Sequence, residues 1–265
     1  MRFLIVLFLL IGCSSTQLEN LHLVNVSNLS KELTENSGLS FYNNSIYTHN
    51  DELGIIYEIA PSTGQILNSI DFDIKDDFEG IEIISNEAIL VNSKGKIYSV
   101  NLESKKTKTH KIKFKNKEEI EGICINLFKK DHILLACKAS DSNKEKYVFN
   151  YDLINKKIDK KPFLKIKLKS LLKYAKSNNL SKKRIEKFAP SGIAISPQSK
   201  EIFITSARGS LLAIFSQDKK LKKIVELNSN ILPQPEGICF NLNNQLFISS
   251  EGKNDNATLC EFLLK

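Results

Sequence analysis

The sequence predicts an all-β fold, a five-bladed β-propeller, and three observations lead to this prediction. A short pattern, an acid or a serine followed by glycine and an apolar run, occurs five times, with glycines at 38, 80, 122, 192 and 237. Their intervals of 42, 42, 70 and 45 residues are mostly those of a propeller blade. Each repeat also contains short apolar or alternating runs bounded by turn residues, which is typical of antiparallel strands.

The chain begins with an apolar segment, MRFLIVLFLLIG, that has the form of a signal peptide at residues 1–12. This segment is about half as long as the roughly 20 residues that cross a bilayer as a helix. The residues LIGC resemble a bacterial lipobox, which implies cleavage before Cys13 and attachment of lipid to it. Several acyl chains on Cys13 would anchor the protein stably. We therefore expect a tether at 13–20 and an extracytoplasmic lipoprotein of the bacterial cell envelope, on the outer or the plasma membrane. An ordinary secretory signal with a chance cysteine is the alternative.

The propeller domain is expected to occupy residues 21–265. The second repeat shows the pattern of one blade most clearly, with four strand-like runs: EGIEII, EAILVNS, KIYSVNL and THKIKF. The first and fourth repeats divide in the same way, but the fifth has only three such runs. The missing strand is available at the other end of the chain, in LHLVNVSNL at 21–29. We expect this N-terminal strand to close the ring and to cover an exposed sheet edge.

The third repeat is longer because it carries an insertion, KSLLKYAKSNNLSKKRIEKFA, with a helical pattern over about 169–188. Leu168, Leu171, Leu172 and Ala175 fall on one helical stripe, and Ser181 is placed to cap a second short helix. A sixth blade hidden here would need alternating runs that this stretch lacks. Six blades remain the alternative prediction.

Three glutamates should converge at one mouth of the central channel. An antiparallel blade places the start of its inner strand beside the end of its second strand, at the same rim. The inner strands start with Ser37, Glu79, Glu121, Ser191 and Glu236, and the second strands end near Asp51, Asn92 and Glu251. The glycine that follows each of these starts permits close backbone approach at the crowded axis.

Three interpretations of these acids stay open. They can be structural, accepting hydrogen bonds from the backbone or pairing with Lys94, Lys138 and Arg208. Glu79, Glu121 and Glu236 can instead hold calcium, which prefers oxygen ligands, with Asp51, Asn92 and Glu251 nearby. The third interpretation is a pocket for a cationic or polyhydroxylated ligand.

The runs SGLSF, SIYTHND, DFEGIEI, PSGIAISP, PEGICF and LFISSEG together resemble the SdiA-regulated family of bacterial propellers. The resemblance spans most of the mature chain and implies an extracytoplasmic propeller. It also implies a distant similarity to phytase-like and lactonase-like propellers, in which acids at the channel mouth bind calcium. Carried over by position, these acids are Glu79, Glu121 and Glu236. The chain departs from a complete acidic ring at Ser37 and Ser191.

Motifs of the common hydrolases and nucleotide-binding enzymes are missing from the sequence. The four histidines, at 22, 49, 110 and 132, lack the spacing of zinc motifs, and there is no GxSxG, Walker or GxGxxG motif. We therefore expect ligand or partner binding at the channel mouth, in a monomer, rather than catalysis. The alternative is a calcium-dependent hydrolase of phosphate esters or lactones.

Cys124 and Cys137 flank a predicted hairpin turn, which would set them nearly opposite on paired strands. A disulfide is possible outside the cytoplasm. The alternative, which we favour, is that both are small buried side chains.

The positive charge is concentrated in residues 156–187, which hold thirteen basic residues against Asp159 and Glu186. This segment lacks the interleaved aromatic residues of a base-stacking surface, so we expect no nucleic acid as partner. Two interpretations remain: a solvated lysine face, or a patch that faces anionic lipid or glycan.

Overall fold

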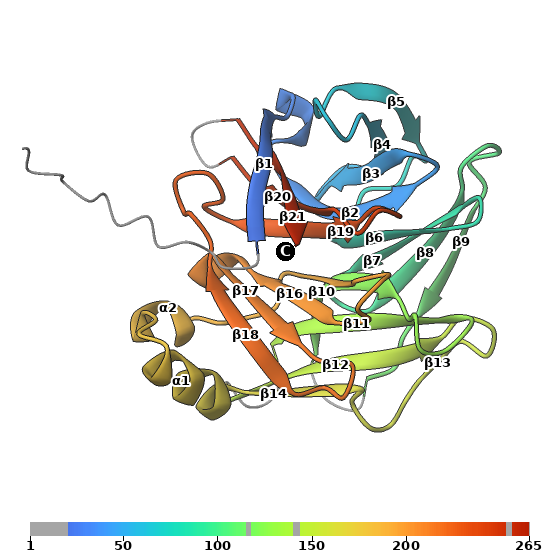
Figure 1. Ribbon diagram of the computed structural model, residues 1–265. Coiled ribbons are helices and arrows are strands. Elements are labelled where there is room, and N and C mark those ends of the chain that lie inside the picture. Colours follow the sequence, from blue (N-terminus) through green and yellow to red (C-terminus); the bar gives the residue numbers. More distant parts are fainter. Residues whose placement is uncertain (1–20, 115–117, 140–143, 253–255, 265) are drawn as a thin grey trace, which may run out of the picture.

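Five antiparallel sheets surround one axis (Figure 1) in the computed structural model, which describes residues 21–114, 118–139, 144–252 and 256–264. Four sheets have four strands and the third has five. This architecture confirms the five-bladed propeller, and the six-bladed alternative is wrong.

The strands follow the order of the repeats. Blade 1 contains β2 (Asn36–Tyr42), β3 (Ser45–Asn50), β4 (Ile55–Ile59) and β5 (Ile66–Asp71), after a short 3₁₀ helix η1 (Lys31–Leu33). Blade 2 contains β6 (Phe78–Ile84), β7 (Glu87–Asn92), β8 (Lys96–Asn101) and β9 (Thr107–Lys111). Blade 3 contains β10 (Glu119–Ile125), β11 (His132–Ala139), β12 (Glu145–Asp152), β13 (Lys157–Ile158) and β14 (Leu164–Lys167). Blade 4 contains β15 (Gly192–Ile195), β16 (Ile202–Ser206), β17 (Leu211–Phe215) and β18 (Leu221–Glu226), with a 3₁₀ helix η2 (Ala207–Gly209). Blade 5 contains β19 (Pro235–Phe240), β20 (Leu246–Ser250), β21 (Thr258–Leu264) and β1 (Leu21–Asn28).

The innermost strands β2, β6, β10, β15 and β19 contact one another in a closed ring around the axis. A separate hydrophobic cluster fills each of the five interfaces between blades. Between blades 1 and 2, for example, Tyr47 and Ile56 pack with Phe78, Ile81 and Tyr98. Because burying one large apolar side chain contributes about 1.5–3 kcal/mol, these interfaces hold the ring together.

The N-terminal strand closes the ring as predicted. β1 pairs antiparallel with β21, from Leu21 opposite Leu264 to Asn28 opposite Thr258. It therefore supplies the outer strand of blade 5 and covers the edge of β21 (Figure 1).

The repeated glycines stand where the inner strands approach each other most closely. A Cβ atom on Gly192 would lie 2.2 Å from the carbonyl oxygen of Glu236, and one on Gly122 would lie 2.9 Å from the Cα of Gly192. Real Cβ atoms do not approach backbone atoms so closely, so the ring needs glycine at these two positions.

The insertion after blade 3 forms α1 (Leu168–Ser177) and α2 (Lys182–Ile185) (Figure 1). Helix α1 contacts β14 and β18, and α2 contacts α1 and η2. Leu171 and Ala175 of α1 are buried, and the Ser181 hydroxyl caps α2 by accepting the backbone N–H of Arg184 at 3.4 Å. The Arg184 guanidinium donates to the carbonyls of Gly209 at 2.7 Å and Leu227 at 2.9 Å, which ties α2 to blade 4. No helix within the described ranges is long and apolar enough to span a membrane.

Cys124 and Cys137 are buried free thiols. Cys124 lies opposite Leu134, and Cys137 lies opposite Ile120, so the two cysteines are not cross-strand partners. The disulfide that their spacing allowed is therefore absent, and the prediction of buried packing is confirmed.

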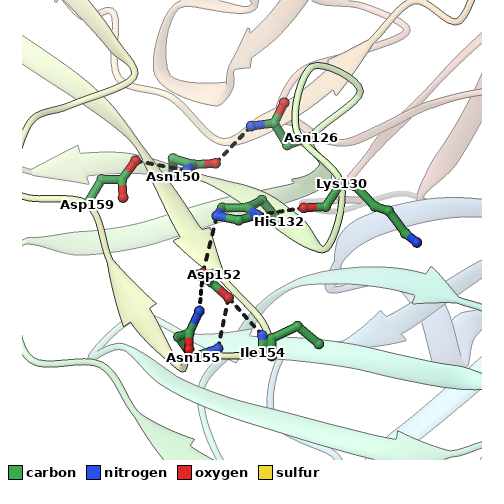
Figure 2. Close-up of polar contacts among 8 residues, drawn as sticks. All are labelled: Asn126, Lys130, His132, Asn150, Asp152, Ile154, Asn155 and Asp159. Atoms are coloured by element: carbon green, nitrogen blue, oxygen red, sulfur yellow. Dashed lines mark hydrogen bonds and ion pairs between the residues drawn. The ribbon is translucent and has the colours of Figure 1, made fainter.

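Polar side chains of the β10–β11 turn and of β12 hold blade 3 together (Figure 2). Asn126 donates to Asn150 at 2.8 Å, and Asn150 donates to Asp159 at 2.9 Å. The His132 Nε2 lies 3.5 Å from a carboxylate oxygen of Asp152. These contacts join the β10–β11 turn to β12, where the following strand β13 is only two residues long.

Candidate functional site

Acidic side chains from four blades meet at one mouth of the channel, in a cavity of about 720 Å³. The carboxylates that line it are Asp51, Asp77, Glu79, Glu121, Glu236 and Glu251. The structure thus brings together five of the six positions that the repeat pattern singled out. Asp77 is the addition: it is the exposed residue two positions before Glu79.

β-bulges place the three glutamates of the inner strands. In β6, Phe78 pairs with Asn92 and Gly80 with Val91, so Glu79 has no partner residue. The same shift occurs around Glu121, and between Pro235 and Ile238 around Glu236. A bulge bends the strand and redirects the extra side chain, which explains how these residues come to line the channel mouth. No sequence signal beyond the glycine that follows each glutamate marks these bulges.

Burial raises the pKa values of Glu79 and Glu236. The pKa of Glu79 rises to about 8, first because the carboxylate is desolvated and then because Glu121 and Asp77 lie nearby. The pKa of Glu236 is raised well above its usual range by burial, with a further contribution from the charge of Glu251. At neutral pH both groups therefore favour the protonated, neutral form.

The two acids that follow the second strands behave in the same way. Burial raises the pKa of Glu251 to about 7, and the charge of Asp51 adds to the effect. Burial likewise raises the pKa of Asp51 to about 6, with a contribution from Glu35. One carboxylate oxygen of Asp51 is buried and has no hydrogen-bond partner in the described part of the chain.

Glu121 is the cavity acid with a cationic partner. Its carboxylate lies 2.8 Å from the Lys138 ammonium, and Glu121 itself is buried. Burial alone would lower the pKa of Lys138, but the hydrogen bond and the charge of Glu121 outweigh burial, so this pKa is raised. The pair therefore supports the structural interpretation for Glu121. Among the described residues, no other ion pair joins two residues of the cavity lining.

The mouth is electrically asymmetric, because blade 4 supplies no acid to it. Ser191 stands where three other blades carry glutamate, and its buried hydroxyl donates to the Pro235 carbonyl at 2.6 Å. Beside it the cavity is lined by the exposed side chains of Arg208 and Lys187. The acids thus lie on blades 5, 1, 2 and 3, and the basic residues gather on blades 3 and 4 and the insertion.

The channel narrows directly below this mouth. The next cavity has a volume of only about 10 Å³. It is lined by the five repeat glycines and the apolar residues that follow them, together with Ser37, Glu79 and Glu236. A ligand larger than water therefore meets a floor at the level of Ile81, Ile123 and Ile193.

Asn92 does not join the site. Its amide donates to Asp76 at 3.1 Å, and its carbonyl oxygen accepts the backbone N–H of Lys96 at 2.7 Å. These contacts hold the β7–β8 turn of its own blade, and Asn92 is not among the residues that line the cavity.

The acids of the mouth do not form a compact metal-binding set. Across the described ranges, no group of three or more His, Cys, Asp or Glu side chains has a geometry that could hold a metal ion. Glu121, one of the three expected calcium ligands, is already paired with Lys138. These observations give no support to a calcium site formed by the three glutamates, and calcium binding stays a prediction.

Comparison with known proteins agrees with this architecture. Residues 19–254 match the SdiA-regulated family. The chain belongs to this family. No curated protein sequence matches the chain. Among solved structures, this SdiA-regulated propeller is similar to the glutaminyl cyclase of Myxococcus xanthus, with a TM-score of 0.62 at 9% identity, covering 92% of this chain and 97% of that one.

A gluconolactonase from Xanthomonas campestris is similar as well, with a TM-score of 0.55 at 10% identity over 93% of this chain and 95% of that one. A luciferin-regenerating enzyme has a TM-score of 0.55 at 12% identity, over 92% and 97% of the two chains. At such low identity these likenesses establish the propeller fold alone.

Proposed function

We propose that the channel mouth of this SdiA-regulated propeller binds a small organic ligand that carries a protonated amine. The observation behind this proposal is the cavity of about 720 Å³, which six carboxylates line. Of these six, Glu121 is the one that forms an ion pair with another lining residue, Lys138. An ammonium group near Glu79 and Glu236 would supply the positive charge that these acids lack. Opposite charge at about 4–6 Å favours the ionised carboxylate, so ligand binding would be coupled to loss of protons.

The basic side of the mouth supports a ligand that also carries a negatively charged group. Arg208 and Lys187 line the cavity beside Ser191, and Arg208 can bind a carboxylate with two parallel hydrogen bonds. A zwitterion such as an amino acid or a short peptide terminus satisfies both sides. The cavity volume lies within the range of about 300–1,000 Å³ that is usual for small-molecule sites.

The same proposal includes the place where the protein works. Cys13 and the preceding segment lie outside the described residues, so lipid attachment rests on the LIGC pattern. A lipid-anchored propeller would present this mouth to ligands outside the cytoplasm. The role is then ligand binding in the bacterial cell envelope.

Calorimetry in two buffers tests the ligand class. We expect an amino acid or amine from a screening panel to bind at pH 7 with a heat that depends on the buffer's ionisation enthalpy, because about one proton is released. Glu236→Gln should weaken binding by about tenfold or more, since it removes a buried charge partner. Glu201→Gln, an acid that pairs with Lys222 outside the cavity, is the matched control and should bind as the unmodified protein does.

Two results would contradict the proposal. Neutral sugars that bind as tightly as amines, without proton release, would point to a polyhydroxylated ligand instead. Calcium would replace the amine if it raised the melting temperature of chelator-treated protein and Glu236→Gln removed this effect. The second result would favour the calcium-dependent hydrolase, which phosphate-ester and lactone substrates would then test.

A further inference from the structure

A second cavity lies between the insertion and blade 4 and shares no residue with the channel mouth. This lysine groove has a volume of about 520 Å³ and is built from three segments: β14, one face of α1, and the β17–β18 turn. Its basic residues are Lys165, Lys167, Lys173, Lys219 and Lys220. No acidic side chain lines it within the described part of the chain.

The fold, and not the basic segment alone, gathers these lysines. Lys165 and Lys167 lie on the same face of β14 because strand residues two apart share a face. Lys219 and Lys220 come from outside the basic segment, in the turn after β17. The Lys219 ammonium lies 4.0 Å from the centre of the Phe163 ring, and this cation–π contact holds the turn against blade 3.

Most of this charge is not neutralised by neighbouring acids. Lys165 is paired with Glu145 at 2.6 Å, and the neighbouring Lys222 is paired with Glu201. Among the described residues, Lys167, Lys173 and Lys220 form no ion pair. Three exposed ammonium groups therefore line one groove, and a bound anion would reduce their mutual repulsion.

The floor of the groove has a different character from its rim. The buried side chains of Ile166, Leu171 and Phe215 line it, together with the partly buried Tyr174 and Leu221. A ligand that fits must combine an anionic group at the lysines with an apolar portion over this floor. A phosphate group can contact several separate lysines at once, because its charge is spread over several oxygens and each ammonium acts as a point charge.

We propose that the lysine groove binds the phosphate headgroup of an anionic phospholipid, and so holds this side of the propeller against a membrane surface. Lysines near an anionic membrane surface each strengthen binding, and the effect weakens with salt. This inference does not depend on the ligand of the channel mouth, since the two cavities share no residue.

Vesicle binding tests the groove with a charge-matched control. The protein would carry Cys13→Ser, so that no attached lipid contributes. Sedimentation with phosphatidylcholine vesicles that contain phosphatidylglycerol should be weakened about tenfold by the triple change Lys167→Gln, Lys173→Gln, Lys220→Gln. The change Lys157→Gln, Lys160→Gln, Lys161→Gln removes the same charge from exposed lysines of the same basic segment outside the groove, and should weaken binding less than about twofold.

A fluorescence reporter locates the contact independently of affinity. The chain contains no tryptophan, so Tyr174→Trp places a single reporter in the groove. Its emission should shift to the blue on vesicles with phosphatidylglycerol, whereas the same change at Tyr42, in blade 1, should not respond. Equal loss of binding in both triple variants, or an unshifted Tyr174→Trp spectrum on bound vesicles, would overturn the proposal. Binding of inorganic pyrophosphate without any vesicle binding would also overturn it, in favour of a soluble phosphate ligand.

Discussion

At the residue scale, the site consists of acids that the fold forces to share a poorly solvated space. Glu79, Glu236 and Glu251 each have a pKa raised by burial. Bulges of the inner strands turn Glu79 and Glu236 into the channel mouth, and Glu251 reaches it from the end of β20. An acid with a raised pKa binds its proton more tightly in the folded chain than in the unfolded chain. The ionised acids therefore destabilise the folded protein when no ligand is bound. A bound cation would offset this destabilisation.

This property predicts a stability that falls as the pH rises. Between pH 6.5 and 8.5 the unfolded chain has already lost these protons, while Glu251 titrates near 7 and Glu79 near 8 in the folded chain. The free energy of unfolding should drop by about 1–3 kcal/mol across this range, after allowance for solvent screening. Burial lowers the pKa of His49 to about 4, so below pH 6.5 the unfolded chain binds the histidine proton more tightly than the folded chain does. In that lower range His49 makes stability rise with pH, and the measurement therefore starts at pH 6.5.

Urea unfolding at a series of pH values measures this slope. Glu79→Gln should make it shallower and should stabilise the protein at pH 8.5, because the neutral amide avoids the buried charge. Glu201→Gln serves as the control and should keep the original slope. Stability that rises over the same range would show that the acids are ionised at little cost in the native protein.

At the scale of single elements, the closing strand has the largest consequence. β1 comes from the start of the described chain and completes the blade formed by its end, with seven paired positions along β21. Without it, β21 would present unpaired backbone N–H and C=O groups, and the apolar cluster between blades 4 and 5 would lose Leu21.

Two truncations separate the strand from the segment before it. A chain that begins at Leu21 retains all of β1 and should unfold like the longer protein. A chain that begins at Leu29 should melt at least about 10 °C lower or aggregate, because several kcal/mol of pairing and packing are lost. Equal melting temperatures of the two truncations, both monomeric by size-exclusion chromatography, would show that closure does not depend on β1.

At the scale of the whole molecule, the propeller presents two chemically opposite surfaces. The channel mouth is acidic and hollow, and the lysine groove is basic with an apolar floor. If Cys13 carries lipid, the tether ends close to β1, and the groove adds a second point of membrane contact. A single lipid anchor would leave the propeller free to rotate, whereas two contacts restrict its orientation.

The lipid anchor is itself a prediction that mass spectrometry decides. In cells that produce it, the mature protein should begin at Cys13 with a mass increased by attached acyl chains, and it should fractionate with membranes. Cys13→Ser should release most of it into the soluble fraction of the envelope, although the lysine groove retains a part at low salt. An unmodified N-terminus at or beyond Ser14 would contradict the anchor.

Local sequence patterns were enough to predict five blades, the closing strand and the rim to which the acids belong. These features depend on local patterns: alternating residues define a strand, and an antiparallel blade brings the start of its first strand to the end of its second. Glu79, Glu121 and Glu236 could therefore be assigned to one mouth from their place before the repeat glycines.

Local patterns could not predict which side chains turn into the mouth or which charged side chains meet elsewhere in the fold. Bulges redirect the three glutamates, while the neighbouring Asn92 turns back to Asp76, and Cys124 and Cys137 miss each other in the register. The lysine groove includes Lys219 and Lys220, which lie in blade 4 and outside the basic segment of the sequence. Each outcome depends on contacts between residues far apart in the chain, and a local pattern carries no information about register or side-chain direction at such contacts.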